Sequence, residues 1–222
     1  MMILENLKMN ELNFIISKKL LLFFLIGYLF GSIPFGIIFT KFGGVEDIRK
    51  IGSGNIGATN VLRTGKKKLA FFTLFFDIFK SYIAIKLSLF LISEYDLFNI
   101  FYQNELFIIS FVGVFSVLGH CFPIWLNFTG GKGVATGIGV MLAFNPILSF
   151  LGILIWIIIF FITKTSSISA LVMYFCYPLL LYTVNADKNL TLGFLIISFT
   201  IFCKHYENIL RIIKKEELKF KK

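Results

Sequence analysis

Charged side chains are scarce in this sequence. Asp, Glu, Lys and Arg make up 15% of its 222 residues, and only 12 residues are acidic. Hydrophobic residues make up 57%, and phenylalanine alone contributes 29. A water-soluble domain of this length would have too few polar side chains to cover its surface. The composition therefore excludes an ordinary soluble protein and favours a chain embedded in lipid.

Cysteine and histidine are also rare, with three and two residues. Cys121, Cys176 and Cys203 lie far apart in apolar stretches and lack a metal-binding spacing, so we interpret them as buried free thiols. We therefore expect no disulfide framework, no metal site and no cofactor. The net charge of +10 is placed beside apolar stretches, where basic residues set topology and meet anionic lipids, so we expect no nucleic-acid partner.

Long apolar runs without strict alternation indicate helices, because backbone groups in lipid must bond within a helix or a closed barrel. We predict an all-α polytopic membrane protein with about seven transmembrane helices in a single integral membrane domain, residues 1–222. The predicted spans are Leu20–Phe39, Leu69–Ile92, Leu106–Leu126, Val134–Phe144, Ile147–Thr163, Ile168–Val184 and Leu190–Cys203. In the first of these, Pro34 is expected to kink the helix.

The weakest of these spans is Val134–Phe144, which is much shorter than the ~20 residues that cross a bilayer and can instead be re-entrant. Merging it with the next stretch would reverse the topology downstream. Charge decides between the two, because seven Lys and Arg lie in 41–68 and seven in 204–222, whereas 93–105 has none. By the positive-inside rule, seven spans place the N-terminus outside and the C-terminus in the cytoplasm.

The ends of the chain differ in character. Residues 1–19 mix acids and lysines without a small-residue cleavage site, so we interpret them as a variable N-terminal segment that is not a cleaved signal peptide. Residues 204–222 form a basic cytoplasmic tail that is expected to be an amphipathic or solvated helix.

The first polar cluster runs from Gly52 to Lys66. It contains a G-x-G-x-x-G pattern, but a dinucleotide-binding fold needs a buried strand before it, and a membrane span precedes it here. Glycines let backbone N–H groups approach an anion, and Arg63 can hold a phosphate through two parallel bonds. The alternative is a capped connecting loop. The uncharged hydrogen-bonding residues of this cluster are Ser53, Asn55, Thr59 and Asn60.

The second cluster combines His120 with the turn Gly130–Gly133. It is no Walker A motif, because Leu126 and Gly133 replace the required Gly and Ser or Thr. Lys132 nevertheless stands at the start of an apolar helix, where free N–H groups and the helix dipole favour an anion. The alternative is a glycine-rich turn with a lysine that extends to the membrane surface.

The third cluster is Lys204–Asn208. His205 and Asn208 are three residues apart and share a helix face, where they can orient a hydroxyl or contact a phosphate. The alternative is an interfacial histidine on a basic tail. Within the second span, Asp77 and Lys80 are also three apart, and we predict a structural ion pair that faces the bundle interior.

Taken in order and spacing, these segments resemble the bacterial acyl-phosphate:glycerol-3-phosphate acyltransferases of the PlsY type, from about Leu25 to Arg211. The resemblance is carried by Gly31–Gly36, Gly52–Lys67, Gly119-His120, Gly130–Gly133, His205 and Glu207–Ile209. Three positions depart from the family pattern: Lys204 stands where Arg is common, Tyr206 also differs, and Ile56 replaces a frequent Pro. Lys204 cannot make the forked contact of an arginine.

The resemblance implies a seven-span enzyme of the bacterial cytoplasmic membrane with its motifs on the cytoplasmic side. It would transfer a fatty acyl group from acyl phosphate to the sn-1 hydroxyl of glycerol 3-phosphate, giving lysophosphatidic acid and phosphate. This reaction is the first acylation step of phospholipid biosynthesis. The expected partners are these two substrates, membrane lipids and the upstream enzyme that makes acyl phosphate, and the chain is expected to be a monomer.

The resemblance also assigns roles to residues. Ser53 and Arg63 match the essential pair of the first family motif, Gly130, Gly131, Lys132 and Gly133 match the glycerol 3-phosphate loop, and His205 and Asn208 match the functional pair of the third motif. Glu207 matches its structural acid. From the clusters themselves, we add the substrate-binding candidates Gly54, Asn55, Thr59, Asn60, Lys66 and His120.

Two mechanistic alternatives follow from the sequence, one for the role of Ser53 and one for the identity of the base. Ser53 can be a nucleophile or, as we prefer, can orient a hydroxyl that attacks directly, and the base is either His205 or a substrate phosphate. Other classes are a transporter or channel for an anionic solute and a different lipid enzyme. The H-x-x-x-x-D acyltransferase motif is absent, because Trp125 and Leu210 stand five residues after the two histidines.

Overall fold

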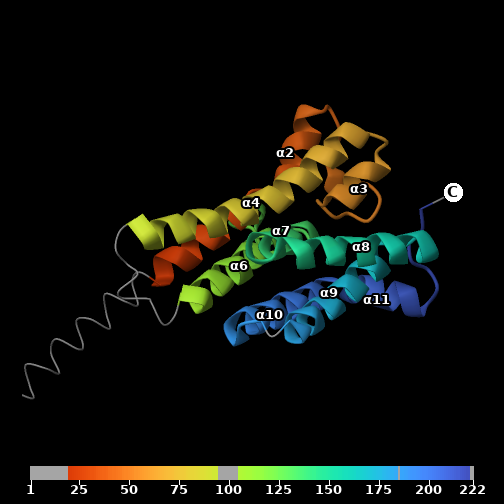
Figure 1. The fold of residues 1–222 in the computed structure, drawn as a ribbon. Helices are drawn as coiled ribbons and strands as arrows, with labels where there is room; N and C mark the ends of the chain where they lie inside the picture. Colours follow the sequence, from red (N-terminus) through yellow and green to blue (C-terminus); the bar gives the residue numbers. More distant parts are fainter. Residues whose placement is uncertain (1–19, 95–104, 185, 221–222) are drawn as a thin grey trace, which may run out of the picture.

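The computed structural model describes residues 20–94, 105–184 and 186–220, and in these ranges the chain is helical without a strand, as the all-α prediction requires. Figure 1 shows the helices packed side by side. After a helix over residues 20–32, the elements are α2 Phe35–Phe42, η1 Ile48–Lys50, α3 Ala58–Arg63, α4 Lys67–Glu94, α6 Glu105–Cys121, η2 Ile124–Leu126, α7 Val134–Phe144, α8 Pro146–Thr163, α9 Ser166–Thr183, α10 Lys188–Lys204 and α11 Tyr206–Ile213.

Each predicted apolar stretch coincides with helical structure. By length and apolar composition, four helical segments of the described chain can cross a membrane: Leu20–Phe42, Glu105–Leu126, Pro146–Thr163 and Ser166–Thr183. The other three stretches lie on α4, which carries internal charges, on α10, which has 17 residues, and on α7, which has 11. An integral membrane protein is therefore supported, and the count of seven crossings stays a prediction.

The short helix α7 lies at the centre of the bundle, packed against α4, α6 and α8, and most of its residues are buried. This close packing depends on Gly139, because a Cβ there would lie 2.0 Å from the carbonyl oxygen of Ile78 in α4. A break follows at Asn145-Pro146, where Asn145 Oδ1 caps α8 by accepting from Leu148 N at 3.0 Å. The stretches of α7 and α8 are therefore two separate helices, and the prediction that each crosses the membrane stays a prediction.

The first apolar stretch is interrupted where Pro34 predicted a kink, since residues 33–34 are not helical. Proline has no backbone N–H to donate the hydrogen bond that would continue the helix. At the break, the carbonyl of Ile33 accepts a hydrogen bond of 2.9 Å from Lys80 Nζ in α4. A cation buried in the bundle thus adds a second hydrogen bond to this carbonyl, which also accepts from Phe35 N at 3.1 Å.

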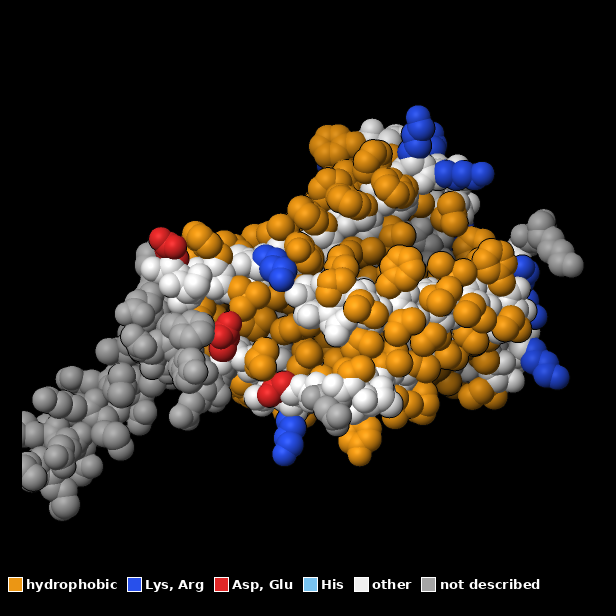
Figure 2. Space-filling view, in the orientation of Figure 1, with side chains coloured by type: hydrophobic (Ala, Val, Ile, Leu, Met, Phe, Trp, Pro, Cys, Tyr) orange, Lys and Arg blue, Asp and Glu red, His pale blue; other side chains and the backbone are white. Residues whose placement is uncertain are grey.

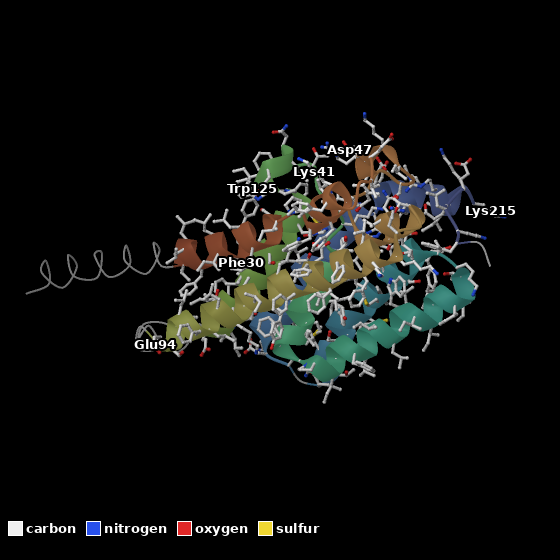
Figure 3. The ribbon with its side chains drawn as sticks, turned by 90° about the horizontal axis from the view of Figure 1, so that it is seen from above. Phe30, Lys41, Asp47, Glu94, Trp125 and Lys215 are labelled. Carbon is white, nitrogen blue, oxygen red and sulfur yellow. The ribbon has the colours of Figure 1, made fainter. Side chains whose placement is uncertain are left out.

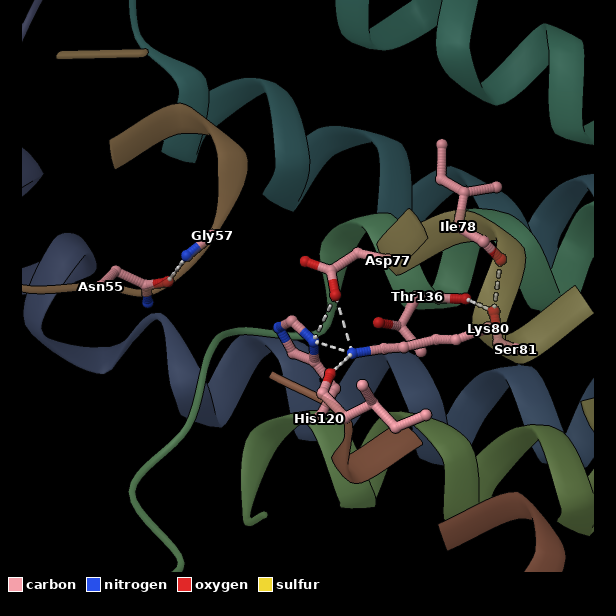
Figure 4. A network of polar contacts seen from close by, with 9 residues as sticks. Asn55, Gly57, Asp77, Ile78, Lys80, Ser81, His120 and Thr136 are labelled. Carbon is pink, nitrogen blue, oxygen red and sulfur yellow. Dashed lines mark hydrogen bonds and ion pairs between the residues drawn. The ribbon is translucent and has the colours of Figure 1, made fainter. Parts of the chain in front are cut away.

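The predicted ion pair of Asp77 and Lys80 is confirmed, and it is part of a larger network (Figure 4). Lys80 Nζ lies 2.7 Å from Asp77 Oδ1 and 3.0 Å from His120 Nδ1, and the Asp77–His120 distance is 3.6 Å. The side chains of Lys80 and Asp77 are only 1% and 2% exposed. The network joins α4, α6 and the break at Pro34 within the apolar interior.

Hydrophobic side chains cover most of the face shown in Figure 2, while most of its Lys and Arg gather at the end that carries α3 and α11. Figure 3 places Lys41, Asp47 and Lys215 toward that end and Glu94 at the other. The cysteines are free, as predicted, but only Cys121 is buried. Our prediction of burial was wrong for Cys203, which is exposed on the outer surface of α10, and Cys176 is half-buried, because apolar residues in a lipid-facing helix need not point inward.

The buried network generates a prediction about stability. Lys80→Met removes the cation and leaves Asp77 uncompensated in an apolar site, so the free energy of unfolding should fall by about 3 kcal/mol. The double variant Asp77→Asn with Lys80→Met removes both charges and should lose less than the single variant. Thermal unfolding of the detergent-solubilised chain measures both changes. A double variant that loses as much as Lys80→Met would contradict the idea that the uncompensated Asp77 charge causes the loss.

Candidate functional site

A cavity of about 500 Å³ opens where the three polar clusters meet. Its lining includes Ser53 and Arg63 from the first cluster, Lys132 from the second, and His205 and Asn208 from the third. The prediction that these distant segments can build one site is therefore supported by their positions. The other predicted residues on the wall are Asn55, Thr59, Asn60, Asp77, His120 and Gly133.

Asn60 organises the first cluster. Its buried side chain accepts from Ser53 N at 2.9 Å and donates to the carbonyls of Ile48, Ile51 and Asn55 at 3.1, 2.9 and 2.8 Å. All four of these hydrogen bonds join the Asn60 amide to backbone atoms of the loop. Asn60 therefore shapes the loop that presents Ser53, which is a different contribution from the direct substrate contact that we predicted.

Two cations from separate elements face the cavity. Arg63 ends α3, and its guanidinium lies 5.3 Å from the centre of the Phe220 ring. Lys132 immediately precedes the α7 N-terminus, and its Nζ donates to Asn208 Oδ1. Burial lowers the pKa of both groups, that of Lys132 to about 8, so Lys132 keeps its charge at neutral pH. The pair can neutralise a phosphate.

His205 is the C-cap of α10 and is only 3% exposed. Its Nδ1 lies 2.8 Å from the carbonyl oxygen of Ile201, so this nitrogen carries the proton and Nε2 has a free lone pair. Burial, followed by the charge of Lys132, lowers the pKa of His205 to about 4. The imidazole is therefore neutral at physiological pH and can accept a hydrogen bond.

Some predicted residues do not line the cavity, namely Gly54, Lys66, Gly130, Gly131, Lys80 and Glu207. Gly131 packs on the ring of His120, where a Cβ would come within 2.0 Å of Nε2, and its N–H donates to the carbonyl of His120 at 3.0 Å. His120 itself is held in the ion network. Glu207 is 84% exposed and lies 3.7 Å from Arg211. Gly131 and Glu207 therefore contact other parts of the protein, and a substrate-binding role for Gly54, Lys66, Gly130 and Gly131 stays a prediction.

Two groups of polar lining residues were not predicted from the sequence. Ser166 and Ser167 begin α9, and Ser166 Oγ lies 3.2 Å from Thr59 Oγ1 at the cavity wall. Glu217 comes from the C-terminal tail. None of the three belongs to a recognisable motif. The signals that could have identified them are serines at a helix start and a carboxylate within a basic tail.

The remaining wall is apolar and is built mainly by α4 and α8. Its larger side chains are Phe71, Leu74, Ile78, Ile153, Trp156 and Ile157. A cationic polar end joined to an apolar wall fits an amphipathic ligand with an anionic head and a hydrocarbon chain. Within the described residues, no three His, Cys, Asp or Glu side chains gather into a group that can hold a metal ion.

Comparison with known proteins identifies the family. The family model described as glycerol-3-phosphate acyltransferase matches residues 21–215. The chain belongs to the glycerol-3-phosphate acyltransferase family. A glycerol-3-phosphate acyltransferase of Bartonella quintana is 42% identical over 211 residues, covering 95% of this chain and 96% of the relative. One of Agrobacterium fabrum is 46% identical over 193 residues, covering 87% and 88%.

Solved structures agree with this family. The crystal structure of PlsY (YgiH), an integral membrane glycerol 3-phosphate acyltransferase, in its glycerol 3-phosphate form has a TM-score of 0.80 and 33% identity. The similarity covers 91% of this chain and 96% of that one. The lysophosphatidic acid form gives a TM-score of 0.79 and 32% identity. The resemblance that the motifs indicated is thereby confirmed.

The environment of His205 leads to a testable prediction. Because its pKa is lowered to about 4, its imidazole should remain neutral and show no titration between pH 5.5 and 8. Carbon-detected NMR of histidine-labelled protein measures this directly, and the chain has only one other histidine. The spectrum of His205→Gln assigns the signal. A midpoint near 6.5 would contradict the buried, neutral state.

Proposed function

We propose that this chain transfers a fatty acyl group from acyl phosphate to the sn-1 hydroxyl of glycerol 3-phosphate, releasing lysophosphatidic acid and phosphate. Membership of the glycerol-3-phosphate acyltransferase family makes the chain an acyltransferase that uses glycerol 3-phosphate. Acyl phosphate as the donor, and the roles of individual residues, are the parts that we propose.

The observation that carries this function is the mixed character of the cavity. Arg63 and Lys132 offer charge for phosphate groups at the polar end, and the wall between α4 and α8 offers an apolar surface for an acyl chain. Both substrates carry a phosphate, and one also carries a long hydrocarbon chain. A site that holds the two together must offset their mutual repulsion and accommodate the chain.

In the proposed reaction, the hydroxyl oxygen of glycerol 3-phosphate attacks the carbonyl carbon of acyl phosphate. A new ester bond forms, the bond from the carbonyl carbon to the phosphate oxygen breaks, and phosphate leaves with the electron pair. Phosphate is a good leaving group, so the enzyme contributes mainly by alignment and by charge stabilisation. Arg63 and Lys132 stabilise the phosphates during this step.

The proton of the attacking hydroxyl needs an acceptor. A neutral imidazole with a pKa of about 4 is a weak base, so we propose that His205 orients the hydroxyl through Nε2 and that a substrate phosphate takes the proton. Among the described residues, no hydrogen bond joins Ser53 Oγ to a histidine or a carboxylate. This supports Ser53 as an orienting hydroxyl in a direct attack and disfavours an acyl-serine intermediate.

We further propose the finer topology. Seven segments cross a bacterial cytoplasmic membrane, the N-terminus lies outside, and the cavity and the 204–222 tail face the cytoplasm as part of one integral membrane domain. The chain acts as a monomer among membrane lipids and receives acyl phosphate from the upstream enzyme that makes it. Support comes from the excess of basic residues in 41–68 and 204–222, and from Lys41 and Lys215, which Figure 3 places toward the same end of the bundle.

A transporter or channel for an anionic solute was the alternative function. Its support was the small residues in the helices and the charge inside the second span, but Asp77 and Lys80 are paired with each other and with His120. This arrangement favours a structural role for the charges. Flux of a phosphorylated solute without acyl transfer would restore the alternative.

The direct test supplies purified protein with acyl phosphate and labelled glycerol 3-phosphate in the absence of coenzyme A. We expect labelled lysophosphatidic acid from the wild type. Arg63→Ala removes a phosphate contact and should lower the rate by about 100-fold or more. The matched control is Arg49→Ala, because Arg49 lies in the same loop but is exposed and paired with Asp47, and its rate should stay within about twofold.

Absence of product from folded wild-type protein would refute the proposed reaction. Full activity of Arg63→Ala would leave the reaction intact but remove Arg63 from its machinery. Retention of the variant in the membrane at wild-type levels excludes loss of folding as the cause of an inactive result.

A further inference from the structure

The C-terminal tail beyond α11 returns to the cavity. The chain reverses at Lys215, whose φ is +60°, and the N–H of Phe220 then donates to the carbonyl of Lys164 at 3.0 Å. The Phe220 ring contacts Phe160, with centroids 5.5 Å apart, and lies beside the guanidinium of Arg63. The family model matches only to residue 215, so most of this returning segment lies outside the family pattern.

Glu217 is the residue that the returning tail places in the cavity wall. Its carboxylate accepts three hydrogen bonds: from Ser167 Oγ at 2.9 Å, from Asn208 Nδ2 at 2.6 Å and from Arg211 Nε at 2.9 Å. Its side chain is only 8% exposed. These donors lower the pKa of Glu217 against the opposing effect of burial, so the group is ionised at neutral pH.

The contact with Asn208 fixes the orientation of an amide that we place in the site. Because Nδ2 donates to Glu217, the amide presents Oδ1 on its other side, where Lys132 Nζ donates to it. A reversed amide would place two donors, its NH₂ and the lysine ammonium, against each other. The carboxylate thereby determines where the Lys132 ammonium is held.

Charge gives Glu217 a second effect on Lys132. The other charged groups that act on this ammonium are Arg211, Arg63 and Glu207, and of the four, Glu217 has the strongest influence. Burial lowers the pKa of Lys132 to about 8, and the Glu217 carboxylate opposes this effect. Neutralising Glu217 would therefore lower the pKa of Lys132 further. The resulting loss of charge on Lys132 would be largest at alkaline pH.

We propose that Glu217 is a positioning residue of the acceptor site, which orients Asn208 and holds the charged Lys132 side chain where it meets the phosphate of glycerol 3-phosphate. This inference rests on the proposed function. Glu217 itself touches no reacting atom in this scheme. Its influence reaches the substrate through Asn208 and Lys132.

The test compares Glu217→Gln with Glu216→Gln, which removes the same charge from the exposed neighbouring residue. The glutamine at 217 retains an oxygen for Asn208 but loses the charge. We expect its KM for glycerol 3-phosphate to exceed that of wild type by about twofold at pH 7 and about tenfold at pH 9, with kcat changed less. Glu217→Ala also releases Asn208, so its KM should be raised at both pH values.

Equilibrium binding of glycerol 3-phosphate without acyl donor provides a second readout, and it should follow the same dependence on pH. Wild-type profiles for Glu217→Gln, or a KM ratio that does not change with pH, would overturn the inference. A lower KM in either Glu217 variant would also overturn it, because it would mean that the carboxylate competes with the phosphate. If the wild type makes no lysophosphatidic acid, the proposed function fails instead.

Discussion

The need to pair polar groups inside lipid governs this structure, and the network of Asp77, Lys80 and His120 meets that need at the base of the cavity. Lys80 also donates to the carbonyl of Ile33 at the Pro34 break. His120 in turn supports the turn that packs Gly131 on its ring and leads directly to Lys132. The structural ion pair of Asp77 and Lys80 thus helps to position Lys132, a cation of the site.

The cavity has two chemically distinct parts because its walls come from different kinds of segment. Polar groups come from helix ends, where backbone groups have no partner within the helix. These ends are the loop that Asn60 organises, the α7 N-terminus and the α10 C-terminus. The helices α4 and α8 supply apolar side chains along their length. The combination matches a reaction between a charged acceptor and a lipid-like donor.

Much of the fold could be predicted from the sequence, because apolar runs, the turn at Asn145-Pro146 and the Asp77–Lys80 spacing are local signals. The three polar clusters were visible too. Contacts made by residues outside any motif were not predictable. Glu217 reaches the cavity only because the tail reverses after α11. Ser166 reaches it only because α9 begins opposite α3. Local pattern also cannot show which side of a lipid-embedded helix faces outward, hence the error at Cys203.

The first polar cluster and the start of α9 meet at the wall of one cavity. Thr59→Cys with Ser166→Cys, in a chain whose native cysteines are replaced by alanine, tests it, since the two hydroxyl oxygens lie 3.2 Å apart. Oxidation in native membranes should link the pair. Thr59→Cys with Ser93→Cys, near the far end of the 28-residue helix α4, should stay unlinked. A folded protein in which positions 59 and 166 do not link would contradict this arrangement of the first polar cluster and α9.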